Sequence, residues 1–385
     1  MSGSLWMLSR KHPPSVGGMQ QLSWHLVQGL SRQRPVTAIT WGRGSRGRGS
    51  WGLPLFFAWA QLRLAWGLAR GRIAVLHLGD PSLAALAWLP RLAGVPVFAT
   101  VHGLDITYPA RWYQAYLAHF FWGRMRAYAC ISRHVQSLVL ARGIAAQDAP
   151  VIPVGIDVAA FLAHAPESIT RHDDCSADDC AEGITDRSDD GPTLLCLGRL
   201  VERKGVAWFL ESVAPRWLVL HPRGRLKIAG DGPLRERIMA LSRSRGMDGR
   251  IEVLGEVDEP GKRRLLAEAD LLLMPNIRVP GDAEGFGLVC LEAGASATWV
   301  LAADIEGLRD AIIEGENGNR VPSGDPIAWS RALDNLCADR DRLRSLGSSA
   351  RSAVDLHFGW PAIVASYAAL SDSLAAGCVG SSTHA

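Results

Sequence analysis

Short apolar runs alternate with segments of helical periodicity along most of the chain. In the first part these runs end at turn residues, as buried parallel strands do. The segments between them repeat apolar positions at helical intervals, which predicts helices. The predicted strands are IAVLHLGD, VPVFATVHG, AYACIS and APVIPVG. Because strands that alternate with helices form right-handed βαβ units, the pattern predicts an open and mostly parallel sheet.

The same alternation resumes after residue 192. Helical segments there separate five apolar runs, which are TLLCLGRL, RLKIAG, RIEVLG, DLLLMPN and TWVLAAD. The chain is therefore predicted to be an α/β protein with two Rossmann-like domains, each built on a parallel sheet. Two such domains in tandem usually face each other across a cleft, with ligands at the carboxyl ends of the strands.

An acidic segment separates the two halves, over residues 164–192. It contains nine Asp or Glu residues and two arginines, and almost no large apolar side chains. Such a segment cannot bury enough apolar surface to order itself, so we expect a flexible interdomain insertion without a catalytic role. The expected divisions are residues 1–163, 164–192 and 193–355, followed by a C-terminal helix and tail over residues 356–385.

Charge is divided unevenly along the chain. The 385 residues have a formal net charge of +3, yet residues 1–125 contain 13 Lys or Arg and two acids, a balance of +11. The other 28 basic and 36 acidic residues give −8, and nine of the 14 tryptophans also lie within residues 1–125. A basic, Trp-rich half favours an anionic membrane surface as partner. Nucleic acid is an alternative partner for such a basic half, but we do not expect it to bind. The other alternative is that the tryptophans lie in an ordinary core and the arginines on a solvated surface.

Three features bear on location. The apolar segment LPLFFAWAQLRLAWGLA, residues 53–69, is shorter than the roughly 20 residues needed to cross a membrane and contains Arg63, so we expect a buried or interfacial amphipathic helix. The start, MSGSLWMLSRKHPP, lacks the apolar region of a secretory signal. The seven cysteines include no Cys-x-x-Cys pair, and a disulfide or metal role for Cys175 and Cys180 is a minor alternative. The expected location is cytoplasmic, with peripheral association at the inner face of the membrane.

Two segments of the second half place polar or glycine residues where a predicted strand passes into a helix. In GRLVERKG, residues 198–205, Arg199 and Lys204 flank a short loop that opens into a helix, which is typical of a phosphate or diphosphate site. In AGDGPLRER, residues 229–237, Gly230 and Gly232 allow a tight turn, and Pro233 occupies a position favoured at helix starts.

A third segment, AEGFGLVCLEAG over residues 283–294, combines two acids with glycines that are costly inside a helix. Gly285 and Gly287 leave room for a ligand oxygen near free amides of the helix start. Glu284 and Glu292 lie about two turns apart and can each accept a hydrogen bond from a hydroxyl. Acids beside an anion site suit a nucleotide sugar, which has both hydroxyls and a diphosphate. The alternative is that the acids cap the helix and the glycines serve packing.

Taken together, these segments resemble the group 1, or family four, glycosyltransferases. The resemblance extends to PPSVGGMQQLSWHLVQGL (residues 13–30), TVHGLD (100–105), VIPVGIDV (151–158) and the tail HFGWPAIVASYAAL. It covers nearly the whole chain except the acidic insertion. It implies the GT-B fold, in which two Rossmann-like domains face each other across a cleft and the last helix returns to the first domain.

The resemblance also implies site residues. Arg199 and Lys204 would bind the donor diphosphate and stabilise the leaving group, and with His102 and Glu284 they form the expected catalytic set. Glu292 would bind the ribose. The other expected donor-binding residues are Gly17, Gly18, Gly230, Gly232, Gly285, Phe286, Gly287 and Leu288.

Sugar transfer in such enzymes retains the anomeric configuration. The resemblance therefore implies a retaining hexosyltransferase with no metal and no cofactor other than the nucleoside-diphosphate sugar, acting on an envelope glycan or a lipid-linked acceptor. No covalent protein nucleophile is assigned.

Two departures from the family pattern leave rivals open. Val154 stands where the family usually has Asn, and Ala297-Thr298-Trp299 replaces a Gly-x-Pro turn. They motivate one alternative, a non-catalytic nucleotide-sugar-binding protein. The other alternative is a sugar-nucleotide epimerase, which has a similar two-domain architecture. A nicotinamide dehydrogenase is disfavoured, since GRGSRG over residues 42–47 is followed neither by a helix start nor by an acid about 20 residues later.

Overall fold

The computed structural model of the chain describes residues 3–13, 17–41, 52–162, 191–244, 247 and 249–380, the side chains of 378–380 excepted. Contacts divide the chain into two compact units, Met1–Gly155 with Trp360–Ala385, and Ile156–Gly359. The first unit thus ends at residue 155 and resumes at residue 360, whereas the expected divisions are at residues 163 and 356, and the contacts do not separate an insertion from the second unit. Most of the acidic segment, with Cys175 and Cys180, and the GRGSRG segment lie outside the described residues.

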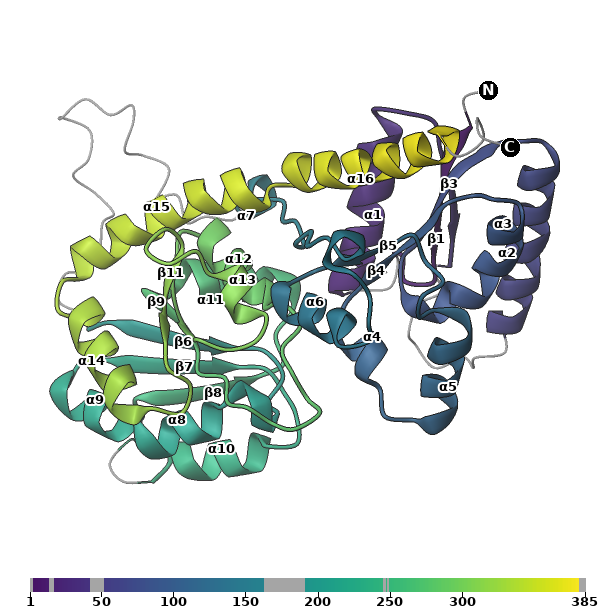
Figure 1. The fold of residues 1–385 in the computed structure, drawn as a ribbon. Coiled ribbons are helices and arrows are strands. Elements are labelled where there is room, and N and C mark those ends of the chain that lie inside the picture. Colours follow the sequence, from purple (N-terminus) through teal and green to yellow (C-terminus); the bar gives the residue numbers. More distant parts are fainter. Residues whose placement is uncertain are drawn as a thin grey trace, which may run out of the picture. The chain divides into compact units, whose positions relative to one another are not determined.

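The first unit contains a parallel sheet of five strands in the order β2-β1-β3-β4-β5 (Figure 1). The strands are β1 (Ser4–Ser9), β2 (Val36–Thr40), β3 (Ile73–Leu78), β4 (Val97–Val101) and β5 (Ala127–Cys130). The first strand was missed by the sequence prediction, although it is almost fully buried. The helices of the first unit are α1 (Gly18–Ser31), α2 (Gly52–Ala69), α3 (Trp88–Leu92), α4 (Leu104–Thr107), α5 (Arg111–Phe120), α6 (Arg133–Leu140) and α16 (Trp360–Gly380). Short 3-10 turns lie at Pro81–Ala87 and Ala146–Asp148.

Prolines explain two further differences between this unit and the prediction. The run APVIPVG does not form a strand and contributes an isolated bridge between Val151 and Cys130. Pro150 and Pro153 remove the backbone donors that a continuous ladder needs. The helix expected over residues 81–94 is a 3-10 turn followed by the short α3.

The C-terminal helix α16 packs within the first unit, beside α1 (Figure 1). Gly29 of α1 lies so close to Val364 that a Cβ there would overlap the valine side chain. Tyr367 of α16 is fully buried, and its hydroxyl lies 3.0 Å from Thr100 Oγ1 on β4. The end of the chain therefore completes the core of the unit that its beginning forms.

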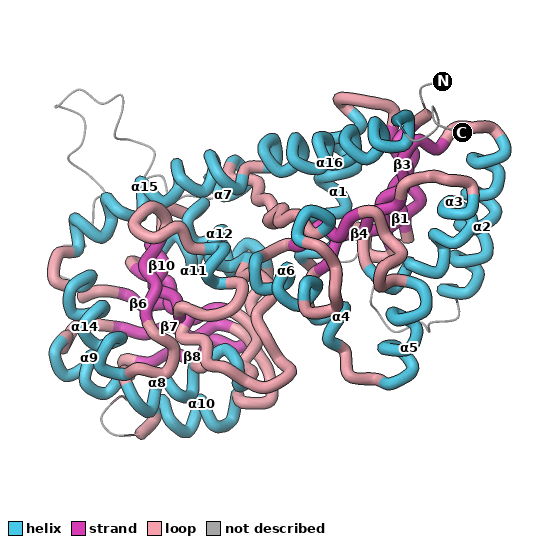
Figure 2. Tube along the Cα trace, in the orientation of Figure 1, coloured by secondary structure: helices cyan, strands magenta, loops and turns pink. Residues whose placement is uncertain are grey.

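The second unit contains a parallel sheet of six strands in the order β11-β10-β9-β6-β7-β8. Figure 2 shows helices on both faces of this sheet. The strands are β6 (Thr193–Leu197), β7 (Arg225–Ala229), β8 (Ile251–Gly255), β9 (Leu271–Met274), β10 (Trp299–Ala303) and β11 (Gly318–Val321). The helices are α7 (Ala159–Leu162), α8 (Val206–Ser212), α9 (Ala214–Leu220), α10 (Arg235–Ser242), α11 (Glu259–Glu268), α12 (Leu288–Ala295), α13 (Leu308–Ala311), α14 (Pro326–Cys337) and α15 (Arg340–Phe358), with a 3-10 turn at Glu202–Lys204.

The second unit also differs from the prediction at a proline. The single helix expected over GVAWFLESVAPRWL is two helices, α8 and α9, that meet at Val213. Pro215 cannot donate the backbone hydrogen bond that would continue α8, so the helix ends before it. The strand β11 was not predicted, because its sequence, GNRV, is short and polar.

In each sheet the strand order changes direction at one point, called the switch point. There the chain crosses back to form a strand on the other side of the first strand of that sheet. In the first unit β3 follows β2 but pairs with β1, and in the second unit β9 follows β8 but pairs with β6. In open parallel sheets the crevice beyond the carboxyl ends of the two central strands is where ligands bind. The topology therefore marks the ends of β1 and β3, and of β6 and β9, as candidate sites.

Candidate functional site

A narrow pocket lies at the switch point of the second sheet. It is lined by the end of β6, the loop that follows it and the end of β9, including Gly198, Arg199, Lys204 and Asn276. The loop after β6 is the GRLVERKG segment, and the loop after β9 leads into AEGFGLVCLEAG. Two of the three motifs found in the sequence thus meet where the topology predicts a ligand.

Glycine holds the two loops together. Gly205 has a φ of 66°, and a Cβ there would overlap the carbonyl oxygen of Pro275 after β9. The amide of Ile277 donates to the carbonyl of Arg203 at 3.0 Å. A side chain at residue 205 would separate the loops, so this glycine is required by close backbone packing.

Lys204 and Glu284 form an ion pair in this site. Lys204 Nζ lies 2.6 Å from Glu284 Oε2, and the two side chains are only 12% and 13% exposed. Arg199, by contrast, is exposed, and its guanidinium makes no hydrogen bond or ion pair with the described residues. The site thus contains one cation bound to an acid and a second cation that is open to a ligand.

Several groups besides Lys204 surround the Glu284 carboxylate. Asn276 Nδ2 donates to Glu284 Oε2 at 3.3 Å, and Arg203 Nε lies 3.7 Å from the same oxygen. Burial by itself would raise the pKa of Glu284, but the Lys204 ammonium, its hydrogen bond and the Arg203 guanidinium outweigh burial and hold that pKa below its usual value. Glu284 is therefore a carboxylate at neutral pH, able to accept hydrogen bonds.

The backbone of Glu284 is fixed from the neighbouring loop. Its amide donates to Glu306 Oε2 at 2.6 Å, and its carbonyl accepts from the amide of Gly307 at 3.0 Å. Glu306 has a φ of 48°, which is unusual for a residue with a side chain. Sequence reasoning missed Glu306, because nothing in its local sequence indicates a bond to a residue 22 positions earlier.

Arg203 was also missed. Its Nη1 donates to both carboxylate oxygens of Asp282, at 3.0 and 3.2 Å, which places its side chain against the loop that contains Glu284. The signal was its position beside Lys204 in Glu-Arg-Lys, but adjacent cations in a loop usually point in different directions. Only the folded loop shows that both approach one acid.

The glycines of AGDGPLRER serve the packing of loops. A Cβ at Gly230 would overlap the carbonyl oxygen of Gly198, and one at Gly232 would overlap the backbone of Leu200. The amide of Leu200 also donates to the carbonyl of Asp231 at 2.9 Å. Both predicted donor-binding glycines therefore hold the loop that presents Arg199, and their contacts are with backbone.

Helix α12 begins one residue beyond the glycine pair of its motif, at Leu288. Gly287 is its N-cap, with a φ of 83°, and no side chain caps the helix. Phe286 is buried against Phe358, and Gly285 approaches Gly307 so closely that a Cβ on Gly307 would overlap its carbonyl. The helices α11, α14 and α15 each begin with an Asp whose side chain accepts from the helix amides, so the absence of a cap on α12 leaves amides available.

Glu292 lies inside α12 and is almost fully buried. Its Oε1 accepts from Lys262 Nζ of α11 at 2.7 Å, a contact that the sequence did not predict. Burial raises the pKa of Glu292, and the Lys262 ammonium opposes that shift without cancelling it. The two acids of the motif therefore have different surroundings, with one pKa lowered and the other raised.

The remaining predicted residues lie in the first unit. His102 follows β4, and its Nε2 lies 3.1 Å from the carbonyl oxygen of Gly79, while its amide donates to Asp105. Burial raises the pKa of Asp105, although the His102 amide and ring oppose the shift. Gly17 is the N-cap of α1 with a φ of 147°, and Gly18 is the first residue of that helix, which has no side-chain cap.

The switch point of the first sheet has its own ion pair. Arg10, after β1, donates through Nε to both oxygens of Asp80, after β3, at 3.1 Å each. Asp80 is fully buried and also accepts from the amide and hydroxyl of Ser82. Both of its oxygens thus accept hydrogen bonds within the unit.

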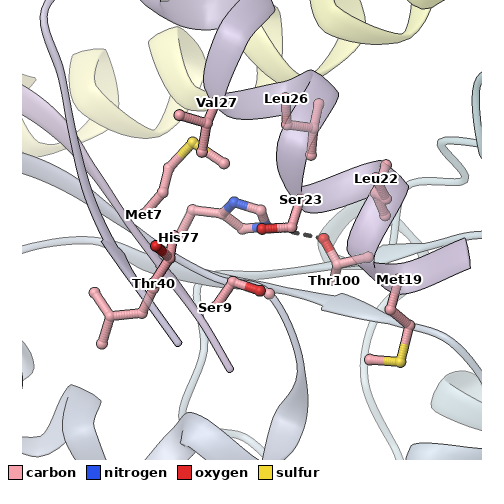
Figure 3. A pocket seen from close by; sticks show the side chains of 12 residues that line it. Met7, Ser9, Met19, Leu22, Ser23, Leu26, Val27, Thr40, His77 and Thr100 are labelled. Atoms are coloured by element: carbon pink, nitrogen blue, oxygen red, sulfur yellow. Dashed lines mark hydrogen bonds between the residues drawn. The ribbon is translucent and has the colours of Figure 1, made fainter. Parts of the chain in front are cut away.

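Beside this ion pair, a mostly apolar pocket lies under α1 (Figure 3). His77 points into it, with Nε2 2.8 Å from Thr100 Oγ1, and its ring stacks on Phe98. Burial, followed by repulsion from His102, lowers the pKa of His77 to about 3. The ring is therefore neutral and forms part of the core, with Met7 of β1 and Val27 of α1 above it.

No group of three or more His, Cys, Asp or Glu side chains suited to a metal ion occurs among the residues that the structure describes. Within the same residues, no helix is both long and apolar enough to cross a membrane.

Comparisons with known proteins agree with the topology. The family of glycosyl transferases group 1 matches residues 182–353, and Glycosyltransferase Family 4 matches residues 16–160. Phosphatidyl-myo-inositol mannosyltransferase of Mycobacterium tuberculosis (strain CDC 1551 / Oshkosh) is 29% identical over 381 residues, covering 92% of this chain and 90% of that protein. The mannosyltransferase of the same name from Mycolicibacterium smegmatis is 30% identical over 309 residues, covering 77% and 70%.

A solved structure shows the same fold. Anabaena Alr3699/HepE in complex with UDP matches with a TM-score of 0.70, over 96% of this chain and 100% of that chain. The sequences are only 16% identical, so the match concerns the arrangement of the elements.

Proposed function

Because this chain belongs to the group 1 glycosyltransferases and has their GT-B fold, we propose that it transfers a hexosyl residue from a nucleoside-diphosphate sugar with retention of the anomeric configuration. In this proposal the acceptor is an envelope glycan or a lipid-linked sugar, and the reaction needs no metal ion. That the chain is a glycosyltransferase follows from its family. The donor, the acceptor, the stereochemistry and the roles of the residues below are the proposal.

The ion pair between Lys204 and Glu284 supports the donor most directly. A nucleoside-diphosphate sugar presents a diphosphate and sugar hydroxyls a few ångströms apart, so its site needs a cation and a carboxylate side by side. The structure has them 2.6 Å apart at the switch point of the second sheet. Without a ligand the two neutralise each other. With one bound, Lys204 would pair with the diphosphate and Glu284 would accept from a sugar hydroxyl.

Charge stabilisation at the leaving group is the chemistry that these residues supply. When the bond between the anomeric carbon and the diphosphate oxygen breaks, negative charge grows on the diphosphate. Arg199 and Lys204 would stabilise that charge through hydrogen bonds from cationic donors, the part that a metal ion plays in other transferases. Losing one such donor typically costs about 3 kcal/mol of transition-state stabilisation. His102 is proposed to act near the anomeric carbon, and no protein nucleophile is assigned.

An exposed apolar surface of the first unit supports a lipid-linked acceptor. Helices α2 and α3 pack together, and α2 has apolar residues on both its buried and its exposed face, so it is not the amphipathic helix that was expected. Leu62 and Leu92 are 71% and 76% exposed. The exposed large apolar residues of the two helices, named here the α2/α3 surface, are Leu55, Trp59, Leu62, Trp66, Trp88 and Leu92.

Cations border this surface. The guanidinium carbons of Arg63, Arg70 and Arg72 lie 5.6, 4.2 and 4.8 Å from the centre of the Trp66 ring. Exposed aromatic and leucine side chains with arginines at their edge fit the interface of a bilayer that contains anionic lipid. The M. tuberculosis relative is named for a phosphatidyl lipid, which favours the same class of acceptor. We therefore place the enzyme at the inner face of the membrane, a reducing location consistent with buried free thiols at Cys130, Cys196, Cys290 and Cys337.

The experiment that tests the donor uses Arg199, because its side chain is exposed and has no partner among the described residues, so it can be removed without disturbing the fold. Thermal melting of the wild type and of Arg199→Ala would be recorded with UDP, GDP, ADP and their sugars. We expect one nucleoside diphosphate to raise the melting temperature of the wild type, and Arg199→Ala to reduce that shift while melting normally on its own. If no nucleotide shifts the wild type, the donor proposal is wrong.

The products then decide between transfer and its rivals. With the donor so identified, NMR of the anomeric proton would show a sugar attached to a membrane-extract acceptor in the donor's own configuration. An inverted linkage would contradict retention. An isomerised donor without transfer would indicate an epimerase, and binding without any product would indicate a non-catalytic protein.

A further inference from the structure

Lys262 lies outside every motif of the sequence, yet it contacts one of the two acids of the candidate site. Its Nζ donates to Glu292 Oε1 at 2.7 Å and lies 3.0 Å from Glu259 Oε2, one turn earlier on α11. The Lys262 side chain is 16% exposed and that of Glu292 is 7% exposed. A lysine on α11 and a glutamate on α12 thus form a largely buried pair that joins two helices.

Only one oxygen of Glu292 is used by this pair. Oε1 accepts from Lys262, whereas Oε2 accepts from no described residue. Oε2 is also not completely shielded from solvent. Glu292 therefore has one anchored oxygen and one that can accept a hydrogen bond from a ligand.

A second buried acid of the same unit shows that this arrangement is not general. Asp270 is as buried as Glu292, but both of its oxygens are occupied. Oδ1 accepts from Arg340 Nε at 2.9 Å, and Oδ2 accepts from Arg340 Nη2 at 2.9 Å and from the Thr193 amide at 2.8 Å. An acid that serves only the fold has its hydrogen-bonding capacity filled by protein. Glu292 does not.

The counter-ion has a physical task at such a site. A carboxylate that is taken out of water without a partner either costs several kcal/mol or becomes protonated. If Glu292 were protonated or free to rotate, it would no longer be a fixed, charged acceptor. It could then not distinguish a ribose hydroxyl from the hydrogen atom that replaces it in a deoxyribose. Lys262 supplies charge and orientation together, and it does so from one side, leaving the other oxygen free.

We propose that Lys262 is a positioning residue for ribose recognition, which anchors Glu292 Oε1 so that Oε2 faces the ribose hydroxyls of the donor. This inference rests on the proposed function, in which Glu292 binds the ribose. It adds that the preference for a ribonucleotide over a deoxyribonucleotide depends on a lysine 30 residues before that acid.

The test compares binding of ribo-, 2′-deoxyribo- and 3′-deoxyribonucleoside diphosphates by calorimetry, using the base identified by melting. The variants are Lys262→Met, Lys262→Arg, Glu292→Gln and, as the matched control, Arg340→Met, which removes the counter-ion of the purely structural acid Asp270. We expect the wild type to prefer the ribonucleotide over at least one deoxy form by about tenfold or more, as for a hydrogen bond to a charged group. Lys262→Met should bring that ratio close to one, and Lys262→Arg should keep most of it.

The control separates positioning from stability. Arg340→Met is expected to lower the melting temperature while leaving the ribose preference unchanged. Lys262→Met must change the preference even if its melting temperature is close to that of the wild type. If Lys262→Met does not fold, Lys262→Gln, which keeps a donor without the charge, is measured in its place and is expected to lose most of the preference.

The outcomes are distinguishable. A wild type without ribose preference would contradict the proposed role of Glu292 and, with it, this inference. A wild-type preference that Glu292→Gln abolishes but both Lys262→Met and Lys262→Gln retain would leave the role of Glu292 standing and overturn that of Lys262.

Discussion

The switch points of the two sheets have the same topology, but the acids at them, Asp80 and Glu284, differ in how fully their carboxylate oxygens are hydrogen-bonded by the protein. In each, a cation in the loop after the first strand pairs with an acid in the loop after the strand on its other side, Arg10 with Asp80 and Lys204 with Glu284. Asp80 is fully buried, and both of its oxygens accept hydrogen bonds, Oδ1 from Arg10 and Ser82 and Oδ2 from Arg10. Around Glu284 all contacts of the described side chains, from Lys204, Asn276 and Arg203, are with Oε2, and the exposed cation Arg199 lies in the same pocket.

This difference separates a pair that holds a fold from a pair that can bind a ligand. A saturated buried pair loses much when broken and has nothing to offer a substrate. An unsaturated pair with a spare cation can exchange its internal bond for bonds to a charged ligand. The second switch point is thus suited to a diphosphate and hydroxyls, while the proposed contributions of the first unit are those of His102 and of the α2/α3 surface.

The largest expected effect breaks the comparison directly. Lys204→Ala should lower kcat/KM for sugar transfer by about 10²- to 10³-fold, because it removes one cationic donor to the leaving group. Arg10→Ala should instead destabilise the fold by about 3 kcal/mol, since it leaves Asp80 buried without its partner. Steady-state kinetics and thermal melting of both variants check this. If Lys204→Ala and Arg10→Ala lost similar amounts of activity and were equally stable, the two ion pairs would not differ in function.

Gly230→Ala tests the packing that presents Arg199. Its Cβ would overlap the carbonyl oxygen of Gly198 at a φ of 136°, so we expect a loss of about 3 kcal/mol in the free energy of unfolding. Gly324→Ala is the matched control, because it has a φ of 75° with open space around it, and backbone strain alone should cost about 1 kcal/mol. Chemical denaturation of both variants measures the difference. Equal losses would mean that loop packing at Gly230 adds nothing.

The surface of the first unit can be tested separately from either switch point. Replacing Trp59 and Leu62 together by serine should weaken binding to vesicles containing anionic lipid by about tenfold or more, because each side chain loses on the order of 1 kcal/mol or more of burial in the bilayer. The control replaces Val219 and Leu220, which are exposed on α9 of the second unit. Vesicle flotation is the measurement. Equal effects of the two double variants would show that general surface hydrophobicity, and not the α2/α3 surface, governs binding.

The two acids of the glycine-rich motif should respond oppositely to pH. The pKa of Glu284 is lowered in the folded state, so its contribution to stability is present above the unfolded pKa and is lost as pH falls through the folded pKa. The pKa of Glu292 is raised, so the folded state takes up its proton first, and stability falls as pH rises from the unfolded pKa through the folded one. Glu284→Gln should therefore flatten the acid loss of stability, and Glu292→Gln should steepen it. Denaturation midpoints in the acid range check this, and slopes that change in the same direction would contradict it.

The smallest effect concerns one of the departures from the family pattern. Ala297 has a φ of 59°, where a side chain is strained, and it stands at the glycine of the usual Gly-x-Pro turn. Ala297→Gly should stabilise the second unit by no more than about 1 kcal/mol, because relief of strain is partly offset by the greater freedom of glycine in the unfolded chain. Activity should be unchanged. A loss of stability would show that the methyl group has packing contacts that outweigh the strain.

Local patterns predicted most of the fold. The alternation of apolar runs and helical segments predicted the parallel strands β3 to β10, because buried strands are continuous apolar runs in the sequence. It missed β1, although that strand lies inside the first sheet. The prediction was wrong where proline or short polar sequence interrupts that signal, as at residues 149–155 and in β11. It also left Trp299 in doubt, whereas the structure places its ring in the core of the second unit, at the start of β10, with Nε1 bonded to Asn319.

The sequence by itself determined which residue types gather at the strand ends, since glycines, cations and acids at strand-to-helix junctions form patterns that can be read locally. Only the tertiary structure decided their partners. Lys204 with Glu284, Lys262 with Glu292, and Arg203 with Asp282 each join residues from different loops or helices. It likewise decided that Gly205 and Gly230 meet neighbouring backbone and that the α2/α3 surface is exposed. The physical reason is that burial and hydrogen-bond satisfaction belong to the packed chain, whereas periodicity and turn chemistry are local.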